Sequence, residues 1–202
     1  MFHLVVNNKN TVANRSSLNA NLSSNPMLPR WYVLRCPDNN ALSMAQEFTD
    51  KGIQAFTPLE YRATTLGEEK LWQQVPSRPD LLFLHATYDE IHDSIAAQKS
   101  GRLQFVYDNT APNASTPLTI PQEAMSNLIR VVECSIPQSY SVTDDEIHYR
   151  PGGMVQVTDG PFKGIIGRVA RIHTQTRVVV SIPGIISYAT TYVPKHQLTP
   201  VE

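Results

Sequence analysis

The sequence predicts an α+β domain, formed by a small and mostly antiparallel sheet with helices, followed by a small β-barrel. Three observations lead to this fold class. Apolar residues at strand spacing and at helix spacing alternate from residue 30 to residue 134. A polar and acidic stretch occupies residues 135–150. From residue 151 on, short β-branched runs are separated by glycine and proline without any helical pattern.

Composition and charge divide the chain into four segments. Residues 1–29 hold seven Asn and four Ser without an apolar face, which predicts a disordered tail. The formal charge is +2 in this tail, −4 over residues 30–134, −2 over residues 135–150 and +3 over residues 151–202. We therefore expect a first domain at 30–134, a linker at 135–150 and a barrel domain at 151–202, with the two domains tumbling semi-independently.

The whole-chain composition excludes several classes of protein. A net charge of −1 gives no general affinity for nucleic acid, so any such role needs a local patch. Cys36 and Cys134 are too few for a disulfide scaffold or a four-ligand zinc site. No apolar run approaches the ~18 residues of a membrane span. We expect a monomeric cytoplasmic protein with no membrane contact, no metal and no cofactor.

The first domain opens with a strand and a helix. Trp31 and the three residues after it form an aromatic and β-branched run typical of a buried strand. Ala41, Ala45 and Phe48 recur at helical spacing before Gly52, which predicts a helix.

A second strand and a hairpin come next. Residues 53–59 are apolar with threonine and aromatic content, which predicts a strand. The polar and turn-rich residues 62–78 predict a long hairpin-like excursion. Residues 81–84 then predict a strand that is hydrophobic on both faces.

Two further helices complete the first domain. One carries a stripe of Tyr88, Ile91 and Ile95, and a strand at 103–107 follows it. The other begins with Pro121 as its first residue and presents one apolar face, made of Met125, Leu128, Ile129 and Val132. We expect all the helices to cover one face of the sheet.

Enzymatic motifs are missing from the sequence. It has no phosphate-binding loop, no His-Glu-x-x-His and no Cys-x-x-Cys. The six histidines are scattered, although a triad assembled from distant residues stays open. We expect a binding protein and not an enzyme.

One motif points to a family. Residues 151–169, PGGMVQVTDGPFKGIIGRV, resemble the KOW motif found in NusG-type transcription factors and in several ribosomal proteins. The first domain is in turn similar to the NusG N-terminal domain, through WYVLRC at 31–36, PDLLFL at 79–84 and PLTIP at 117–121. The resemblance covers residues 30–202. The opening run and EIHDS at 90–94 look closest to specialised paralogues of the RfaH and UpxY type.

The resemblance implies an SH3-like KOW barrel and contacts with RNA polymerase. An apolar cavity would bind the clamp helices of the polymerase through Trp31, Tyr32, Leu81, Phe83 and Phe105. A polar patch on the opposite rim, made of His92, Asp93 and Ser94, would touch the gate loop of the β subunit. The alternative that the aromatic and leucine side chains simply form the core stays open.

The barrel could have a partner of its own. Candidate contacts with a protein or RNA are Phe162, Lys163, Arg168 and Ile182. Ribosomal protein S10 and nucleic acid are candidate partners, although Pro183 stands where the general factor has an aromatic residue. The resemblance implies a specialised elongation and antitermination factor that suppresses pausing and termination in polysaccharide (capsule) operons. The alternative function is a KOW-type RNA-binding or ribosome-associated module.

Overall fold

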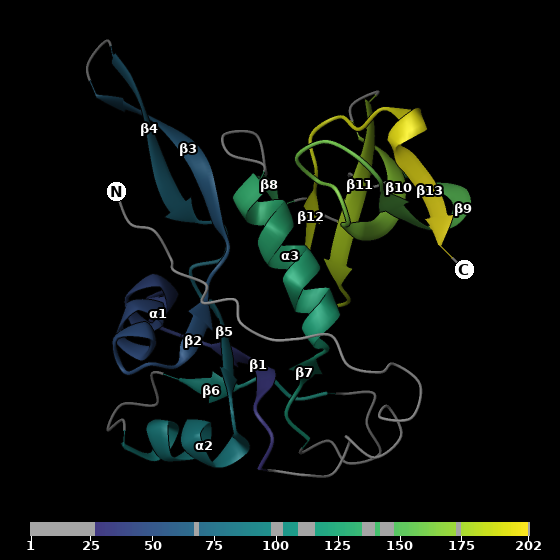
Figure 1. The fold of residues 1–202 in the computed structure, drawn as a ribbon. Coiled ribbons are helices and arrows are strands. Elements are labelled where there is room, and N and C mark those ends of the chain that lie inside the picture. Colours follow the sequence, from purple (N-terminus) through teal and green to yellow (C-terminus); the bar gives the residue numbers. More distant parts are fainter. Residues whose placement is uncertain are drawn as a thin grey trace.

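The computed structural model describes residues 27–66, 69–97, 103–108, 116–134, 140–141, 148–172 and 175–201. A small sheet, a projecting two-stranded ribbon and a strand-rich C-terminal part make up the molecule (Figure 1). The predicted tail at 1–29 falls almost entirely outside the described residues. No helix in the described part of the chain is long and apolar enough to cross a membrane.

The first sheet has an antiparallel core of two six-residue strands, β1 (Arg30–Arg35) and β5 (Leu81–Ala86). Val33 pairs with Phe83, and both side chains point to one face of the sheet. Leu34 pairs with Leu82, and both of these side chains point to the opposite face. Short strands extend this core in the order β2-β5-β1-β6, and β7 also pairs with β1. Their bounds are Gln54–Phe56 for β2, Gln104–Phe105 for β6 and Thr119–Ile120 for β7.

Helices cover both faces of this sheet. On one face Tyr32 and Leu34 share a core with Phe48 of α1 (Ala41–Asp50) and Ile91 of α2 (Tyr88–Ala97). The expectation that all helices lie on one face is wrong, because α3 (Gln122–Cys134) packs on the other. The reason lies in the sequence, since strands that are apolar on both faces need cover on both faces.

α3 meets the opposite face of β1 and β5. There Trp31, Val33 and Phe83 share a core with Met125 and Leu128 of the helix. Successive side chains of a strand point to opposite sides, so Trp31 and Tyr32 belong to different cores.

The excursion before β5 is a hairpin, as the sequence predicts. β3 (Leu59–Leu66) pairs with β4 (Glu69–Pro76) as a separate two-stranded sheet. This ribbon projects away from the rest of the molecule (Figure 1). Trp72 on β4 is 64% exposed.

The C-terminal sheet is entirely antiparallel, in the order β13-β9-β10-β11-β12-β8. Its longest strands are β9 (His148–Val157), β10 (Ile166–Ile172) and β11 (Gln175–Ile182). The shorter ones are β8 (Tyr140–Ser141), β12 (Ile186–Ala189) and β13 (Leu198–Val201), with a 3₁₀ turn at Lys195–Gln197. β8 and the start of β9 fall within 135–150, so the sheet includes part of the segment predicted as a linker.

The glycines of the KOW motif set the geometry of this sheet. Gly164 has a φ of +86°, which side chains disfavour, and closes the turn between β9 and β10. Gly167 lies where strands β10 and β11 meet closely, since a Cβ there would stand 2.5 Å from the Val179 carbonyl oxygen. The structure therefore accounts for both glycines by backbone geometry.

The barrel packs against the first domain. α3 lies between the first sheet and the barrel (Figure 1), and Leu128 and Val131 join one core with Phe162, Ile165 and Val180. The sequence predicted semi-independent domains because residues 135–150 are polar. In the structure the two domains instead dock through α3. The prediction considered only the apolar face of α3 that packs on the sheet, and it did not consider that the helix also packs against the barrel.

Candidate functional site

The structure divides the five residues predicted to bind the clamp helices between two faces of the sheet. Trp31, Leu81 and Phe83 lie on the α3 face and are 4%, 1% and 0% exposed. Tyr32 and Phe105 lie on the face covered by α1 and α2. These five side chains therefore do not line one cavity.

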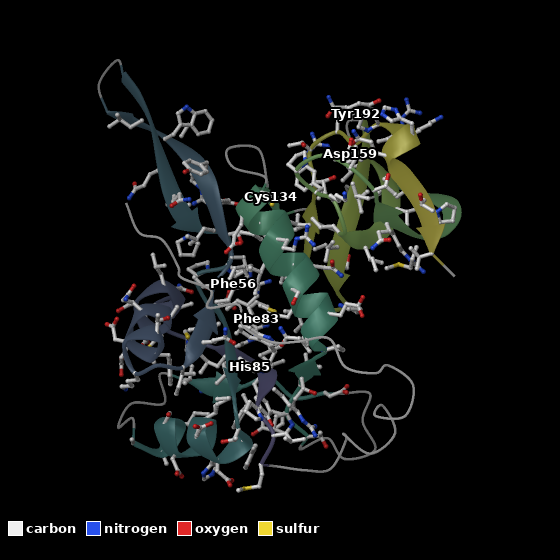
Figure 2. All side chains as sticks on the ribbon, viewed as in Figure 1. Phe56, Phe83, His85, Cys134, Asp159 and Tyr192 are labelled. Atoms are coloured by element: carbon white, nitrogen blue, oxygen red, sulfur yellow. The ribbon has the colours of Figure 1, made fainter. Side chains whose placement is uncertain are left out.

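The α3 face is a packed aromatic and aliphatic layer. Trp31 donates a hydrogen bond of 2.9 Å from Nε1 to Gln122 Oε1 at the start of α3. The rings of Phe83 and Phe56 lie 6.2 Å apart, and His85 lies 5.2 Å from the Trp31 ring. Figure 2 shows Phe56, Phe83 and His85 together in the middle of the first domain. Burial lowers the pKa of His85 and so favours the neutral ring in this layer.

The other face ends in a stack of aromatic rings. Tyr88 of α2 lies parallel to Phe105 of β6, with centroids 5.5 Å apart and planes inclined by 8°. Tyr32 meets Phe105 edge-on at 5.8 Å. Burial raises the pKa of Tyr32, an effect that nearby Arg30 opposes. Tyr32 thus lies in the buried part of this face and contacts the stack through Phe105.

The predicted polar patch lies on α2. His92 and Asp93 are exposed, and His92 Nδ1 lies 3.8 Å from Asp93 Oδ1. Ser94 is half-buried, and its hydroxyl donates to the Glu90 carbonyl at 2.7 Å. Two of the three residues are thus available to a partner, while the Ser94 hydroxyl has a partner within its own helix.

A capping box fixes the start of α2. Glu90 Oε2 accepts hydrogen bonds from the backbone N–H of Thr87 at 2.8 Å and from its hydroxyl at 2.7 Å. These bonds lower the pKa of Glu90. The box holds the helix that carries His92 and Asp93 in place.

The four predicted barrel contacts have different environments. Phe162 and Ile182 are buried, at 3% and 4% exposure, and belong to the core that α3 shares with the barrel. Lys163 and Arg168 have exposed side chains. The carbonyl of Lys163 accepts a hydrogen bond from Arg130 of α3. Of these four residues, Lys163 and Arg168 are the two whose side chains a further partner can reach while the domains are docked.

The interface between the domains contains residues that the sequence analysis missed. Tyr188 of β12 donates a hydrogen bond to Ser77 Oγ, just before β5. Arg78 donates to the carbonyl of Ile185 at 3.5 Å, and the Ile166 N–H donates to Asn127 Oδ1 at 3.3 Å. A fully buried tyrosine needs a partner for its hydroxyl, but the burial of Tyr188 is visible only in the structure, so the sequence carried no signal for this contact.

Arg78 is held at this interface by Asp80. Its Nε and Nη2 atoms donate to the two Asp80 carboxylate oxygens at 3.0 and 3.1 Å. Arg35 forms a second ion pair with Asp80. The hydrogen bond from Arg78 holds the pKa of Asp80 below its usual range.

A groove of about 1110 Å³ opens beside these contacts, between α3 and the barrel. Its walls combine apolar and polar residues, among them Ala124, Asn127, Met154, Arg168 and Pro183. Among the described residues, no group of three His, Cys, Asp or Glu could hold a metal ion.

Comparison with known proteins identifies the family. Residues 29–129 match the profile of the family described as "Transcription termination factor nusG", and residues 151–181 match the KOW motif. A comparison with curated proteins gives no match. Among solved structures, one titled "Domain interaction in Thermotoga maritima NusG" is 13% identical over 88% of this chain and 100% of that chain, with a TM-score of 0.41. With half of its residues matched by the first profile, the chain belongs to the NusG family and is a transcription factor of the NusG type.

Proposed function

We propose that this NusG-type factor binds RNA polymerase through its first domain and suppresses pausing and termination without catalysing a reaction. The observation that carries the proposal is the match of residues 29–129 to a family whose members bind RNA polymerase. We assign the clamp-helix contact to the α3 face of the sheet, with Trp31, Leu81 and Phe83. We assign the gate-loop contact to His92 and Asp93, which are exposed on α2.

Access to the α3 face sets a condition on this binding. Phe83 is 0% exposed, and the barrel contacts the chain at Ser77 and Arg78, immediately before β5. Undocking the barrel would expose the apolar core that it shares with α3 and break a few hydrogen bonds of about 1 kcal/mol net each, so the partner must cover a comparable apolar surface. We propose that the barrel leaves its docked position when polymerase binds.

The effect on transcription then follows from differential affinity. A factor that binds the closed clamp more tightly than the open clamp disfavours paused states, and a tenfold preference corresponds to about 1.4 kcal/mol. A factor with equal affinity for both states would change nothing. The opening run WYVLRC and the EIHDS segment support a specialised role, which we propose is antitermination in polysaccharide (capsule) operons.

A second candidate function is RNA binding by the barrel. Tyr192 is 55% exposed, and its neighbour Val193 donates a backbone hydrogen bond to Thr176, the β-partner of Arg171. Arg171 is exposed as well, and an exposed aromatic ring and an exposed arginine on one domain favour binding of RNA. In this reading the barrel would be the active part of a ribosome-associated protein.

The test compares the two functions in one series. The full chain is incubated with RNA polymerase and with polymerase whose clamp-helix tip has been deleted, and separately with single-stranded RNA in a gel shift. The proposal predicts capture of the intact polymerase, loss of capture with the deletion and no shift of RNA. Capture that is independent of the tip overturns the clamp contact. A shift of RNA without capture supports the second function.

Tyr188→Phe adds a second arm to this test. The substitution removes the hydrogen bond from the barrel to Ser77 without touching the α3 face of the sheet. If the barrel must leave, this variant binds polymerase more tightly than the wild type does. Tyr192→Phe is the matched control, since it removes an exposed hydroxyl from the same domain.

A further inference from the structure

Four aromatic rings form a continuous row along the α2 side of the first domain. We call Tyr107, Phe105, Tyr88 and His92 the aromatic row. The centroid distances between successive rings are 6.5, 5.5 and 5.7 Å, and the last two pairs are stacked. The rings come from three places in the chain, namely α2, β6 and the bridge after β6.

The row is buried at its middle and open at its ends. Phe105 and Tyr88 are half-buried and pack against the core that includes Tyr32 and Ile91. Tyr107 is 47% exposed, and the His92 side chain is 59% exposed. An exposed tyrosine ring held by a neighbouring aromatic ring offers a flat face with little conformational freedom to lose on binding.

The described residues of α2, the helix that carries two rings of the row, are acidic. α2 carries Asp89, Glu90 and Asp93, all exposed, and its described residues include no lysine or arginine. Asp93 has 85% of its side chain exposed and lies beside His92. Arg30 is the basic residue that influences Tyr32 beneath the row, and it has an interaction partner already.

We propose that the aromatic row and the acidic face of α2 bind an arginine-bearing protein segment. One guanidinium would stack on the exposed His92 ring, with its N–H groups reaching the neighbouring Asp93 carboxylate, and a second would stack on the exposed Tyr107 ring at the other end of the row. Arginine fits better than lysine because its planar head stacks on rings and donates a fork of hydrogen bonds. Unpaired nucleic acid, the other ligand that stacks on aromatic rings, would bring phosphates toward three carboxylates.

This inference deepens the proposed function and rests on it for the source of the segment. His92 and Asp93 are the residues assigned above to the polymerase gate loop. The partner surface that reaches α2 would therefore present at least one arginine at the aromatic row.

The experiment titrates the ¹⁵N-labelled full chain with three short peptides of the same length, which alternate glycine with arginine, lysine or glutamate. A single-stranded oligothymidylate is the nucleic-acid probe. We expect the arginine peptide to shift the amide signals of residues 88–93 and 104–107. Its affinity should exceed that of the lysine peptide about two- to fivefold.

Matched variants locate the site. Tyr107→Ala and Asp93→Asn should each weaken binding of the arginine peptide about two- to fivefold. The controls are Tyr192→Ala and Asp159→Asn, which change exposed residues of the same types on the barrel (Figure 2). These controls should leave the affinity unchanged.

Three results would overturn the inference. They are equal affinity for the arginine and lysine peptides, oligothymidylate binding at residues 88–93, and equal effects of the row variants and their controls. If one of these results is found and the wild-type chain still captures polymerase in the test of the proposed function, that function stands while the arginine site fails. If the arginine peptide binds at the aromatic row as expected but polymerase is not captured, the arginine site stands. The arginine-bearing segment would then not come from the polymerase.

Discussion

The hydroxyl of Tyr188 donates a hydrogen bond to the hydroxyl of Ser77, a residue 111 positions earlier in the chain. Tyr188 is 0% exposed and lies in β12 of the barrel, whereas Ser77 directly follows the hairpin of the first domain. A buried phenol is thereby satisfied by a residue of the other domain. The stability of the barrel and the docking of the two domains are linked through this contact.

Tyr188→Phe should lower the free energy of unfolding by about 1 kcal/mol, because the ring stays and one hydrogen bond is lost. Urea denaturation measures the change.

Burial also raises the pKa of Tyr188 in the folded protein above its ordinary value of about 10. Above that value the unfolded state releases a proton that the folded state keeps, so wild-type stability should fall as the pH rises. An equally steep alkaline decline in Tyr188→Phe would contradict this assignment.

Asp80→Asn should lower the free energy of unfolding modestly and change how that free energy depends on pH in the acidic range. The carboxylate accepts from Arg78 and Arg35, but the two guanidinium side chains are 38% and 50% exposed, so solvent screening limits the loss to about 1 kcal/mol or less. The pKa of Asp80 is lowered in the fold, so its contribution is present above its unfolded pKa and disappears as the pH falls through the folded pKa. Denaturation curves from neutral to acidic pH should therefore differ least between variant and wild type at the acidic end. A constant difference at every pH would rule out the ion pair as the cause.

Gly167→Ala should destabilise the barrel by about 1–3 kcal/mol, the usual cost of forcing extra volume into a packed site. The new methyl group would stand 2.5 Å from the Val179 carbonyl oxygen and 2.8 Å from Val178 Cγ1. Thermal unfolding checks the effect. Gly153→Ala is the control from the same motif, since its nearest neighbour, the Val201 carbonyl oxygen, lies 4.0 Å away. Similar melting temperatures for the two variants would show that β10 and β11 separate easily.

Asn127→Ala should loosen the docking of the barrel on α3. The substitution removes the acceptor of the Ile166 N–H and leaves the sheet-facing residues of α3 unchanged. NMR relaxation should give one rotational correlation time for both domains in the wild type and shorter, separate times in the variant combined with Tyr188→Phe. Separate times already in the wild type would favour the semi-independent domains predicted from the sequence.

Strand and helix periodicity predicted the elements of the first domain well, for reasons visible in particular residues. The run at residues 81–84 alternates between two cores, and Ala41, Ala45 and Phe48 are buried as their spacing predicts. The stripe of Met125, Leu128, Ile129 and Val132 likewise packs on the core beneath α3. Each of these predictions depends on local spacing, which the sequence contains directly.

Contacts between distant residues could not be predicted in the same way. Trp31 and Tyr32 are neighbours in the sequence, and resemblance assigned both to one cavity, yet the pleat sends them to opposite faces. Val131 is fully buried although it lies outside the predicted stripe of α3. An apolar residue at this position, outside the stripe, was the feature of the sequence that could have indicated packing on another side of α3. Ser77 and Asn127 carried no such signal, because a polar side chain on the surface of one domain shows its role only beside the other.

The position of α3 also affects the order in which the protein can assemble during translation. The ribosome completes α3 before it makes the barrel strands β9 to β13, whose residues pack on Leu128 and Val131. Because domains fold as units from the N-terminus during synthesis, the first domain emerges with the outer surface of this helix bare. A nascent chain of this length therefore displays an apolar strip that the docked barrel hides, and the residues that cover it are synthesised after the helix itself.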